Sequence, residues 1–268
     1  MHGKEVMIAP LLHESLGINV SIPVGFNTDQ FGTFTRDITR VGNQLEAARA
    51  KARAALKLTG ADLALASEGS FGTHPSIPFV SSNLEIVVLI DTKHTIEIVG
   101  YYRTSAVQAR GQSVHTPAEA LTVATSWGFP DQGVILRSSE NNSRNIYKDI
   151  VTEADLITRA TTLLASYFRS TIFIETDMRA HRCPLRRESI KLATLDLIKN
   201  CQSLCPTCTT PGFVITKVVT GAPCRACLLP TDRPLETIYS CQKCAHSQSL
   251  DNQETKMVEP AYCNNCNP

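Results

Sequence analysis

Residues 45–56 read LEAARAKARAAL and residues 62–70 read DLALASEGS, and these two runs decide the expected fold. Five residues of the first run recur at helical spacing: Leu45, Ala48, Ala52, Ala55 and Leu56. The run therefore predicts an alanine-rich helix, from about residue 42 to residue 58, that packs closely on a sheet. The second run predicts a strand that delivers an acid, Glu68, into a glycine-containing loop.

The rest of the N-terminal part alternates between strand and helix patterns. Strands are expected over residues 18–22, 84–90, 96–102, 133–137 and 171–176, and helices near residues 8–16, 117–127, 152–167 and 188–201. Residues 91–94 predict a hairpin turn, and residues 68–83 hold so many glycines and prolines that a long loop is expected. The sequence predicts an α/β fold with a mixed sheet and an inserted hairpin. Residues 1–202 are expected to form this domain and residues 203–268 a small zinc-ribbon domain.

Composition excludes several classes of protein. The 268 residues are 43% hydrophobic and 19% charged, which is ordinary for a globular chain. The formal net charge is +1, so there is no overall basic field for nucleic acid. We see no apolar run long enough to span a membrane and no signal-peptide pattern. Because eight of the ten cysteines form Cys-x-x-Cys pairs, metal ligation in the cytoplasm is predicted rather than disulfides.

Four Cys-x-x-Cys knuckles follow residue 200, and each can present two thiolates to a zinc ion. The ligands are Cys205, Cys208, Cys224, Cys227, Cys241, Cys244, Cys263 and Cys266. Fifteen residues separate the first two knuckles and eighteen the last two, which favours sequential pairing. Interleaved pairing, first knuckle with third, is the alternative. Two closed, structural Zn²⁺ sites are expected, with His246 surplus to the ligand count.

Cys183 and Cys201 lie outside the knuckles. We interpret both as ordinary buried or half-buried thiols. The alternative is a reactive Cys183, because neighbouring arginines lower the pKa of a thiol.

Two carboxylates are the candidates for catalysis. Glu68 follows a strand, where α/β sheets place their ligands. Glu46 lies in the first helical turn, where an acid also suits the helix dipole. Brought together, Glu46 and Glu68 could hold a divalent metal such as Mg²⁺.

Basic residues near helix starts and in loops add candidate phosphate ligands. Those near the acids are Lys4, Arg36 and Lys51, and a second group follows the last strand: Arg179, His181, Arg182, Arg186 and Arg187. Basic side chains at a helix N-terminus suit phosphate, although a solvated basic loop gives the same pattern. Trp127 and Phe129 could stack on a base or belong to the core.

The whole chain resembles a bacterial family catalogued only as a domain of unknown function. The matching stretches are MHGKE at residues 1–5, FGTFTRD at 31–37, SEGSFG at 67–72 and ETDMRAHR at 175–182, together with the four knuckles. The resemblance implies no activity. It does imply a strand before the MHGK segment, so either the first strand is missing or the fold begins at the first helix.

Residues 46–55, EAARAKARAA, are more remotely similar to the Glu-Asn-Ala-x-x-Lys-Ala-Arg-Ala-Ala helix of the inosine/xanthosine triphosphate pyrophosphatase superfamily. Glu68 before Gly69, Lys4 and the Ala180-His181-Arg182 segment are similar to further motifs of that superfamily. The chain departs from the pattern at Ala47, which replaces asparagine, and at residues 67–68, which replace paired aspartates.

The resemblance implies a Mg²⁺-dependent hydrolase of nucleoside triphosphates or related phosphate compounds. Glu46 and Glu68 would hold the metal, Lys4, Arg36 and Lys51 the phosphates, and His181 and Arg182 the base.

Two other hypotheses concern the zinc tail. It could be a non-catalytic module that binds nucleic acid or a protein. Its basic residues are Lys217, Arg225, Lys243 and Lys256, but Asp232, Glu236, Asp251 and Glu254 are interspersed with them. That mixture argues against a strong phosphate footprint. The tail could instead be purely structural.

Overall fold

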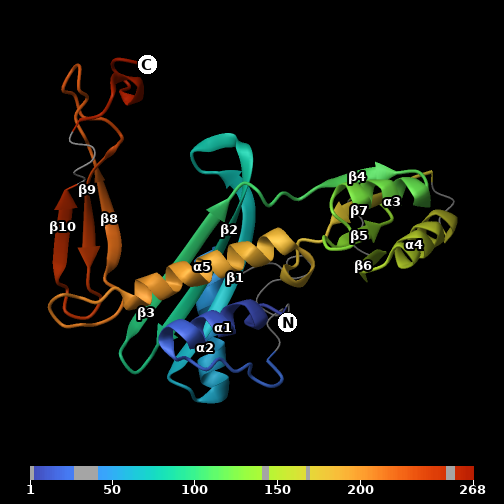
Figure 1. The fold of residues 1–268 in the computed structure, drawn as a ribbon, viewed down its shortest axis with the longest axis horizontal. Helices are drawn as coiled ribbons and strands as arrows, with labels where there is room; N and C mark the ends of the chain where they lie inside the picture. Colours follow the sequence, from blue (N-terminus) through green and yellow to red (C-terminus); the bar gives the residue numbers. More distant parts are fainter. Residues whose placement is uncertain (1–2, 27–41, 141–144, 167–169, 252–256) are drawn as a thin grey trace.

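A computed structural model of the chain describes residues 3–26, 42–140, 145–166, 170–251 and 257–268. They form three antiparallel sheets and five α-helices, of which α5 (Pro184–Gln202) runs lengthwise through the molecule (Figure 1). The predicted α/β class and the inserted hairpin are confirmed. What the sequence predicts as one mixed sheet consists, in the described part, of separate antiparallel sheets.

The central sheet has the order β1-β2-β3 and contains the inserted hairpin. Its strands are β1 (Leu63–His74), β2 (Ile77–Asp91) and β3 (Ile96–Thr104). The long loop predicted over residues 68–83 is wrong, because these residues pair from Glu68↔Ile86 to Thr73↔Ser81. Gly69 and Gly72 do not interrupt β1, because a glycine weakens a strand but keeps the backbone groups that pair across the sheet.

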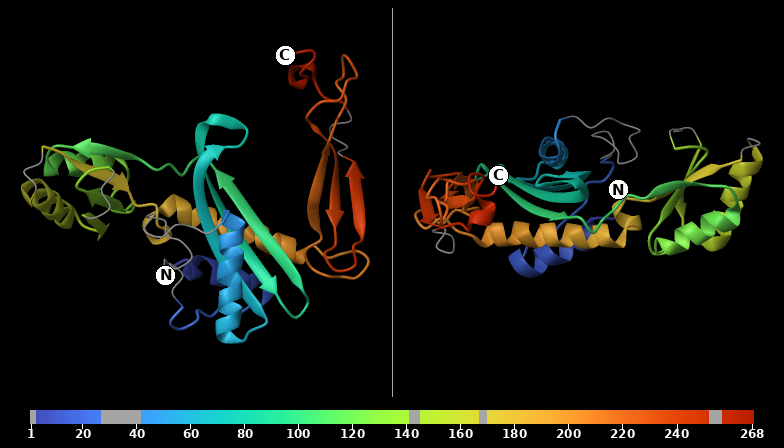
Figure 2. Two further views of the ribbon diagram at one scale, coloured as in Figure 1. Left: turned by 180° about the vertical axis from the view of Figure 1, so that it is seen from behind. Right: turned by 90° about the horizontal axis from the view of Figure 1, so that it is seen from above.

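Helices cover both faces of the central sheet. α2 (Gln44–Thr59) lies on one face, and α1 (Glu5–Leu16) and α5 lie on the other (Figure 2). α2 begins with a capping box between Asn43 and Glu46 and ends at Gly60, which has a φ of 69°. Because strand side chains alternate between faces, β2 contributes to a hydrophobic cluster on each side.

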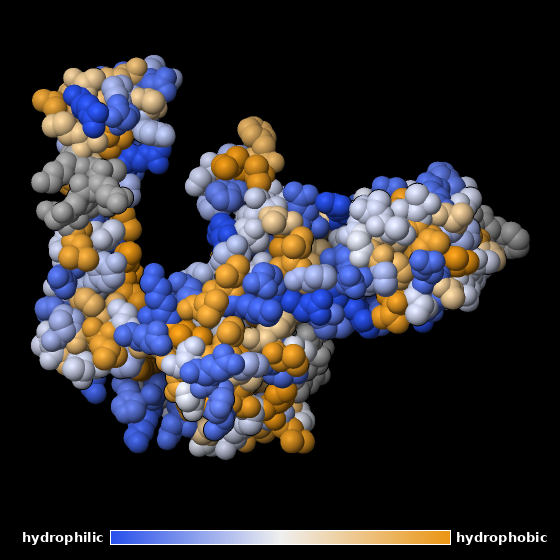
Figure 3. All heavy atoms as spheres, in the orientation of Figure 1, coloured by the Kyte–Doolittle hydropathy of each residue, from blue (hydrophilic) through white to orange (hydrophobic). Residues whose placement is uncertain are grey.

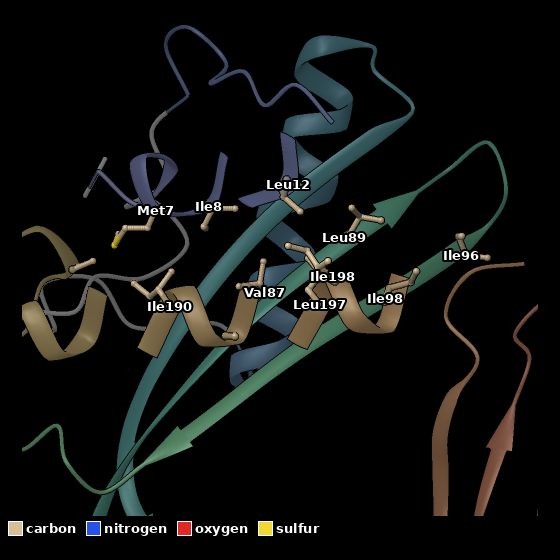
Figure 4. Packing of buried hydrophobic residues seen from close by; sticks show 12 residues of the cluster. Met7, Ile8, Leu12, Val87, Leu89, Ile96, Ile98, Ile190, Leu197 and Ile198 are labelled. Atoms are coloured by element: carbon tan, nitrogen blue, oxygen red, sulfur yellow. The ribbon is translucent and has the colours of Figure 1, made fainter. Parts of the chain in front are cut away.

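The larger of these clusters joins α1, the central sheet and α5 (Figure 4). Its buried members include Met7, Ile8, Leu12, Val87, Leu89, Ile96, Ile98, Ile190, Leu197 and Ile198. Gly100 lets α5 approach β3 closely, since a Cβ there would collide with the backbone of Ala193 and Leu197. The strand predicted over residues 18–22 is wrong. Ile18 and Val20 pack against this core as irregular chain, where the hydrophobic contact is made without a sheet partner.

The outer sheet, with the order β4-β7-β5-β6, lies at one end of α5. Its elements are β4 (Gly111–Val114), α3 (Pro117–Ser126), β5 (Val134–Arg137), β6 (Ile146–Ile150), α4 (Glu153–Ser166) and β7 (Ile172–Thr176). The helices and strands share one apolar core. The sequence analysis missed β4 and β6, which are short strands of four and five residues.

The zinc ribbon lies at the other end of α5. It consists of β8 (Val214–Thr220), β9 (Pro234–Ser240), β10 (Ser247–Asp251) and the 3₁₀ turn η4 (Pro260–Tyr262), with strand order β10-β9-β8. The ribbon projects away from the central sheet, and open space separates it from the tip of the β1–β2 hairpin (Figure 3). Among the residues that the structure describes, no helix combines the length and hydropathy needed to cross a membrane.

Candidate functional site

The eight knuckle cysteines gather into two groups of four. We call Cys205, Cys208, Cys241 and Cys244 the proximal zinc site, and Cys224, Cys227, Cys263 and Cys266 the distal zinc site. In the proximal site, Sγ of Cys205 lies 3.7 Å from that of Cys244, and Sγ of Cys208 lies 3.6 Å from that of Cys241. In the distal site, the Cys224–Cys266 and Cys227–Cys263 separations are 3.8 and 3.6 Å. Tetrahedral zinc with Zn–S bonds of about 2.3 Å requires S–S separations of about 3.8 Å. Each group therefore fits one Zn²⁺ ion, and four thiolates leave no open coordination position.

The sequential pairing favoured by loop length is wrong, and the interleaved alternative is confirmed. The reason is the length of β8. Its seven residues span about 23 Å at 3.3 Å per residue, so the first and second knuckles lie at opposite ends of the ribbon. β9 then returns the chain, and the third knuckle meets the first.

The proximal zinc site is attached to the central sheet. The Gln242 side chain accepts from the backbone N–H of Glu97 at 3.1 Å and donates to the Glu97 carbonyl at 2.6 Å. It therefore pairs with the free edge of β3 as a neighbouring strand would. His246 stacks on Phe213, with ring centroids 5.8 Å apart, and so supports the site without being a ligand.

A second cluster of polar side chains lies at the outer edge of β1, and we call Lys4, Gln44, Lys51 and Glu68 the edge cluster. Lys51 and Glu68 form an ion pair in which both side chains are largely buried. Lys4 Nζ donates to the Ser67 carbonyl at 3.1 Å. Gln44 Nε2 donates to the Glu68 carbonyl at 2.7 Å. The structure thus brings together three of the predicted site residues, Lys4, Lys51 and Glu68.

The ammonium group of Lys4 is strongly affected by this environment. Burial, and next the positive charge of Arg186, lower its pKa from 10.5 to about 8, against the opposing effect of Glu85 and Glu68. A group with this pKa can gain or lose a proton near neutral pH.

A buried ion pair between Glu85 and Arg186 lies on the face of the central sheet that α5 covers, opposite to the face that carries Glu68 and Lys51. Arg186 Nε lies 2.6 Å from Glu85 Oε1, and the two side chains are 2% and 0% exposed. Gly69, opposite Glu85 in the sheet, provides the room, since a Cβ there would collide with both side chains. Glu85 is not apparent as a buried residue in the sequence, because an acid within a strand is usually exposed to solvent.

Glu46 lies elsewhere. It is exposed, and its carboxylate accepts from the backbone N–H of Asn43 at 2.8 Å. At 3.6 residues per turn it points away from the side of α2 on which Gln44 and Lys51 contact β1. The structure therefore does not bring Glu46 to Glu68. Arg36 lies outside the described residues.

His181 and Arg182 form part of the turn η2 (Ala180–Arg182), between β7 and α5. Together with Arg179 they converge on Asp149 of β6. Gly3 lies close to His181, since a Cβ on Gly3 would be 4.0 Å from that of His181. The η2 turn is thus near the start of α1, which carries Lys4.

The aromatic and thiol candidates are buried or half-buried. Phe129 is buried in the core of the outer sheet, and Trp127 packs against the same core. Burial raises the pKa of Cys183, and it raises the pKa of Cys201 to about 11. Neither thiol has the lowered pKa of a reactive cysteine.

The family of the chain follows from its sequence. Residues 51–268 match the family described as Domain of unknown function (DUF6671). The chain belongs to this family, whose matched region includes the edge-cluster residues Lys51 and Glu68 and all eight zinc ligands. The searches found no curated protein and no solved structure that matches the chain.

Proposed function

We propose that this protein is a zinc-stabilised hydrolase of nucleoside triphosphates or related phosphate compounds, with its site at the edge cluster. The proposal rests on one observation. Lys4 and Lys51 lie near Glu68 at one sheet edge, next to the N-terminus of α1. Ammonium groups and a helix N-terminus both favour an anion. The two lysines thus outnumber the one carboxylate of the edge cluster, and the charges of Arg186 and Glu85 also act on Lys4.

In this proposal Lys4 and Lys51 bind phosphate oxygens, and Glu68 positions Lys51. His181 and Arg182, near the start of α1, extend the site toward the rest of the ligand. Catalysis at such a site would be mostly positioning and charge stabilisation. We propose that the protein resides in the cytoplasm, where the zinc-binding thiolates stay reduced.

The Mg²⁺ ion predicted between Glu46 and Glu68 does not fit the arrangement of these two residues. Glu46 caps α2 on its outer side, and Glu68 is paired with Lys51. No role in catalysis therefore falls to a Mg²⁺ ion held by these two carboxylates.

The test is release of phosphate and pyrophosphate from a panel of nucleotides, with and without Mg²⁺. Lys51→Met and Glu68→Gln should each lower the rate on the order of a hundredfold, as expected for loss of a charge-stabilising contact. Lys57→Met is the matched control, because Lys57 is exposed near the end of the same helix. The proposal fails if no nucleotide is cleaved, or if Glu68→Gln cleaves as fast as the unmodified protein.

A second candidate function is binding of nucleic acid or a protein by the distal zinc site. The favouring observation is the exposure of Leu228 and Tyr262, each of which adjoins a cysteine of the distal zinc site. A mobility shift with RNA or DNA that weakens with salt, and that is lost on replacing Cys227 and Cys266 by serine, would support it. A shift that survives this change would place nucleic-acid binding elsewhere.

A further inference from the structure

One oxygen of Asp149 receives an unusual number of donors. Oδ1 lies 2.9 Å from Arg179 Nη2, 3.1 Å from both Nε and Nη2 of Arg182, and 3.4 Å from His181 Nε2. The other oxygen, Oδ2, lies 3.2 Å from Arg179 Nη1. A carboxylate oxygen offers about two lone-pair positions, so the three guanidinium N–H groups alone exceed what Oδ1 can satisfy.

Arg179 has no need of Asp149 for charge balance. Its guanidinium also binds Asp177, with Nε at 3.0 Å from Oδ1 and Nη2 at 2.6 Å from Oδ2. The Asp177 side chain is 1% exposed, so this pair is fixed in the protein interior. The Asp149 side chain, in contrast, is 49% exposed.

The backbone at Asp149 is also unusual. Its φ is 61°, in the left-handed region that residues other than glycine seldom occupy. Burial alone would raise the pKa of Asp149, but hydrogen bonds and charges from Arg179, followed by Arg182 and His181, lower it to about 2. The carboxylate is therefore an anion held by basic side chains and open to solvent.

We propose that Arg179, His181 and Arg182 form a binding site for a phosphoryl group, and that Asp149 occupies this site when no such ligand is bound. A phosphoryl group has three terminal oxygens, which match the three converging side chains better than one carboxylate oxygen does. Arginine forks are suited to this geometry. The Arg182 and His181 side chains are 28% and 30% exposed, so a ligand can reach them from solvent.

This inference takes its substrate class from the proposed function and adds to it. It assigns phosphate recognition to Arg179, and it makes Asp149 a competitor that phosphate must displace. Binding at this site would thus be weak unless the ligand also engages a neighbouring site. Gly3, next to Lys4, lies against His181, so a ligand with several phosphates could span both sites.

The test is calorimetric titration of the full, zinc-loaded chain with inorganic pyrophosphate at low ionic strength. Asp149→Asn removes the competing charge, and asparagine tolerates the left-handed backbone. We expect about tenfold tighter binding, which corresponds to about 1.4 kcal/mol. Glu153→Gln, which removes one negative charge at an exposed position on α4, is the matched control and should leave the affinity unchanged.

Adding Arg182→Gln should abolish the gain, whereas adding Arg187→Gln, at an exposed arginine of α5, should not. The inference is overturned if Asp149→Asn binds no tighter than Glu153→Gln, or if the gain survives Arg182→Gln. Should Asp149→Asn not fold, Arg182→Gln in the unmodified chain must bind pyrophosphate more weakly than Arg187→Gln. Equal affinities would overturn the inference. A tighter-binding Asp149→Asn without nucleotide cleavage would reject the proposed hydrolase alone.

Discussion

Breaking the buried pair between Glu85 and Arg186 should destabilise the protein far more than breaking an exposed pair. The two side chains are 0% and 2% exposed, and Arg186 Nη1 also donates to the Met178 carbonyl at 2.6 Å. This pair ties α5 to the middle strand of the central sheet. Removing one partner leaves the other charge buried without its ion pair, which costs about 3–5 kcal/mol. We expect this loss for both Glu85→Gln and Arg186→Met.

The double variant separates pairing from packing. If the pair acts as a unit, Glu85→Gln combined with Arg186→Met should cost less than the sum of the single changes, with a coupling energy of about 1–3 kcal/mol. Arg49→Gln is the control. Arg49 and Glu97 also lie 2.6 Å apart, but their side chains are 35% and 23% exposed. Loss of that more exposed pair should cost only about 0–1 kcal/mol.

The assay is urea unfolding of the zinc-loaded chain, followed by far-ultraviolet circular dichroism, with the free energy of unfolding extrapolated to water. The reasoning is refuted if Glu85→Gln costs no more than Arg49→Gln. Additive single changes would show that Glu85 and Arg186 do not act as a pair.

Three further predictions concern metal binding, pH and packing. Removing the first and third knuckles together should leave one zinc ion per chain by metal analysis, and removing the first and second should leave none; the reverse result would restore sequential pairing. Because the pKa of Lys4 is lowered from 10.5 to about 8 on folding, the unfolded chain binds this proton more tightly. The free energy of unfolding should therefore gain a rising contribution between pH 8 and pH 10.5, which Lys4→Met removes; identical pH profiles would contradict this. Gly69→Ala should lower the melting temperature, since its Cβ collides with Glu85 and Arg186, whereas Gly72→Ala, where a Cβ meets no atom within 4 Å, should not. Equal melting temperatures would show that the Glu85–Arg186 pair can shift at no cost.

Local patterns in the sequence were sufficient for most of the helices and for the zinc ligands. The capping residues around α2 and the spacing within each Cys-x-x-Cys knuckle involve neighbours along the chain, so they can be recognised from one stretch. Glu68, Lys51 and Lys4 are predicted as site residues one by one for the same reason, and their role stays a prediction. The division into residues 1–202 and 203–268 stays a prediction, which limited proteolysis would test.

Tertiary structure decided which of these residues meet. Knuckle pairing depends on how far β8 carries the chain, and the loop length between cysteines does not contain that information. Glu46 and Glu68 have different partners because Glu46 lies on the outer side of α2, whereas Glu68 lies on a strand that α2 covers. Glu85 pairs with Arg186, which is 101 residues away along the chain, and the two side chains fit because Gly69 has no Cβ. Residue type and local spacing thus identify the chemical groups, whereas long-range packing determines their partners.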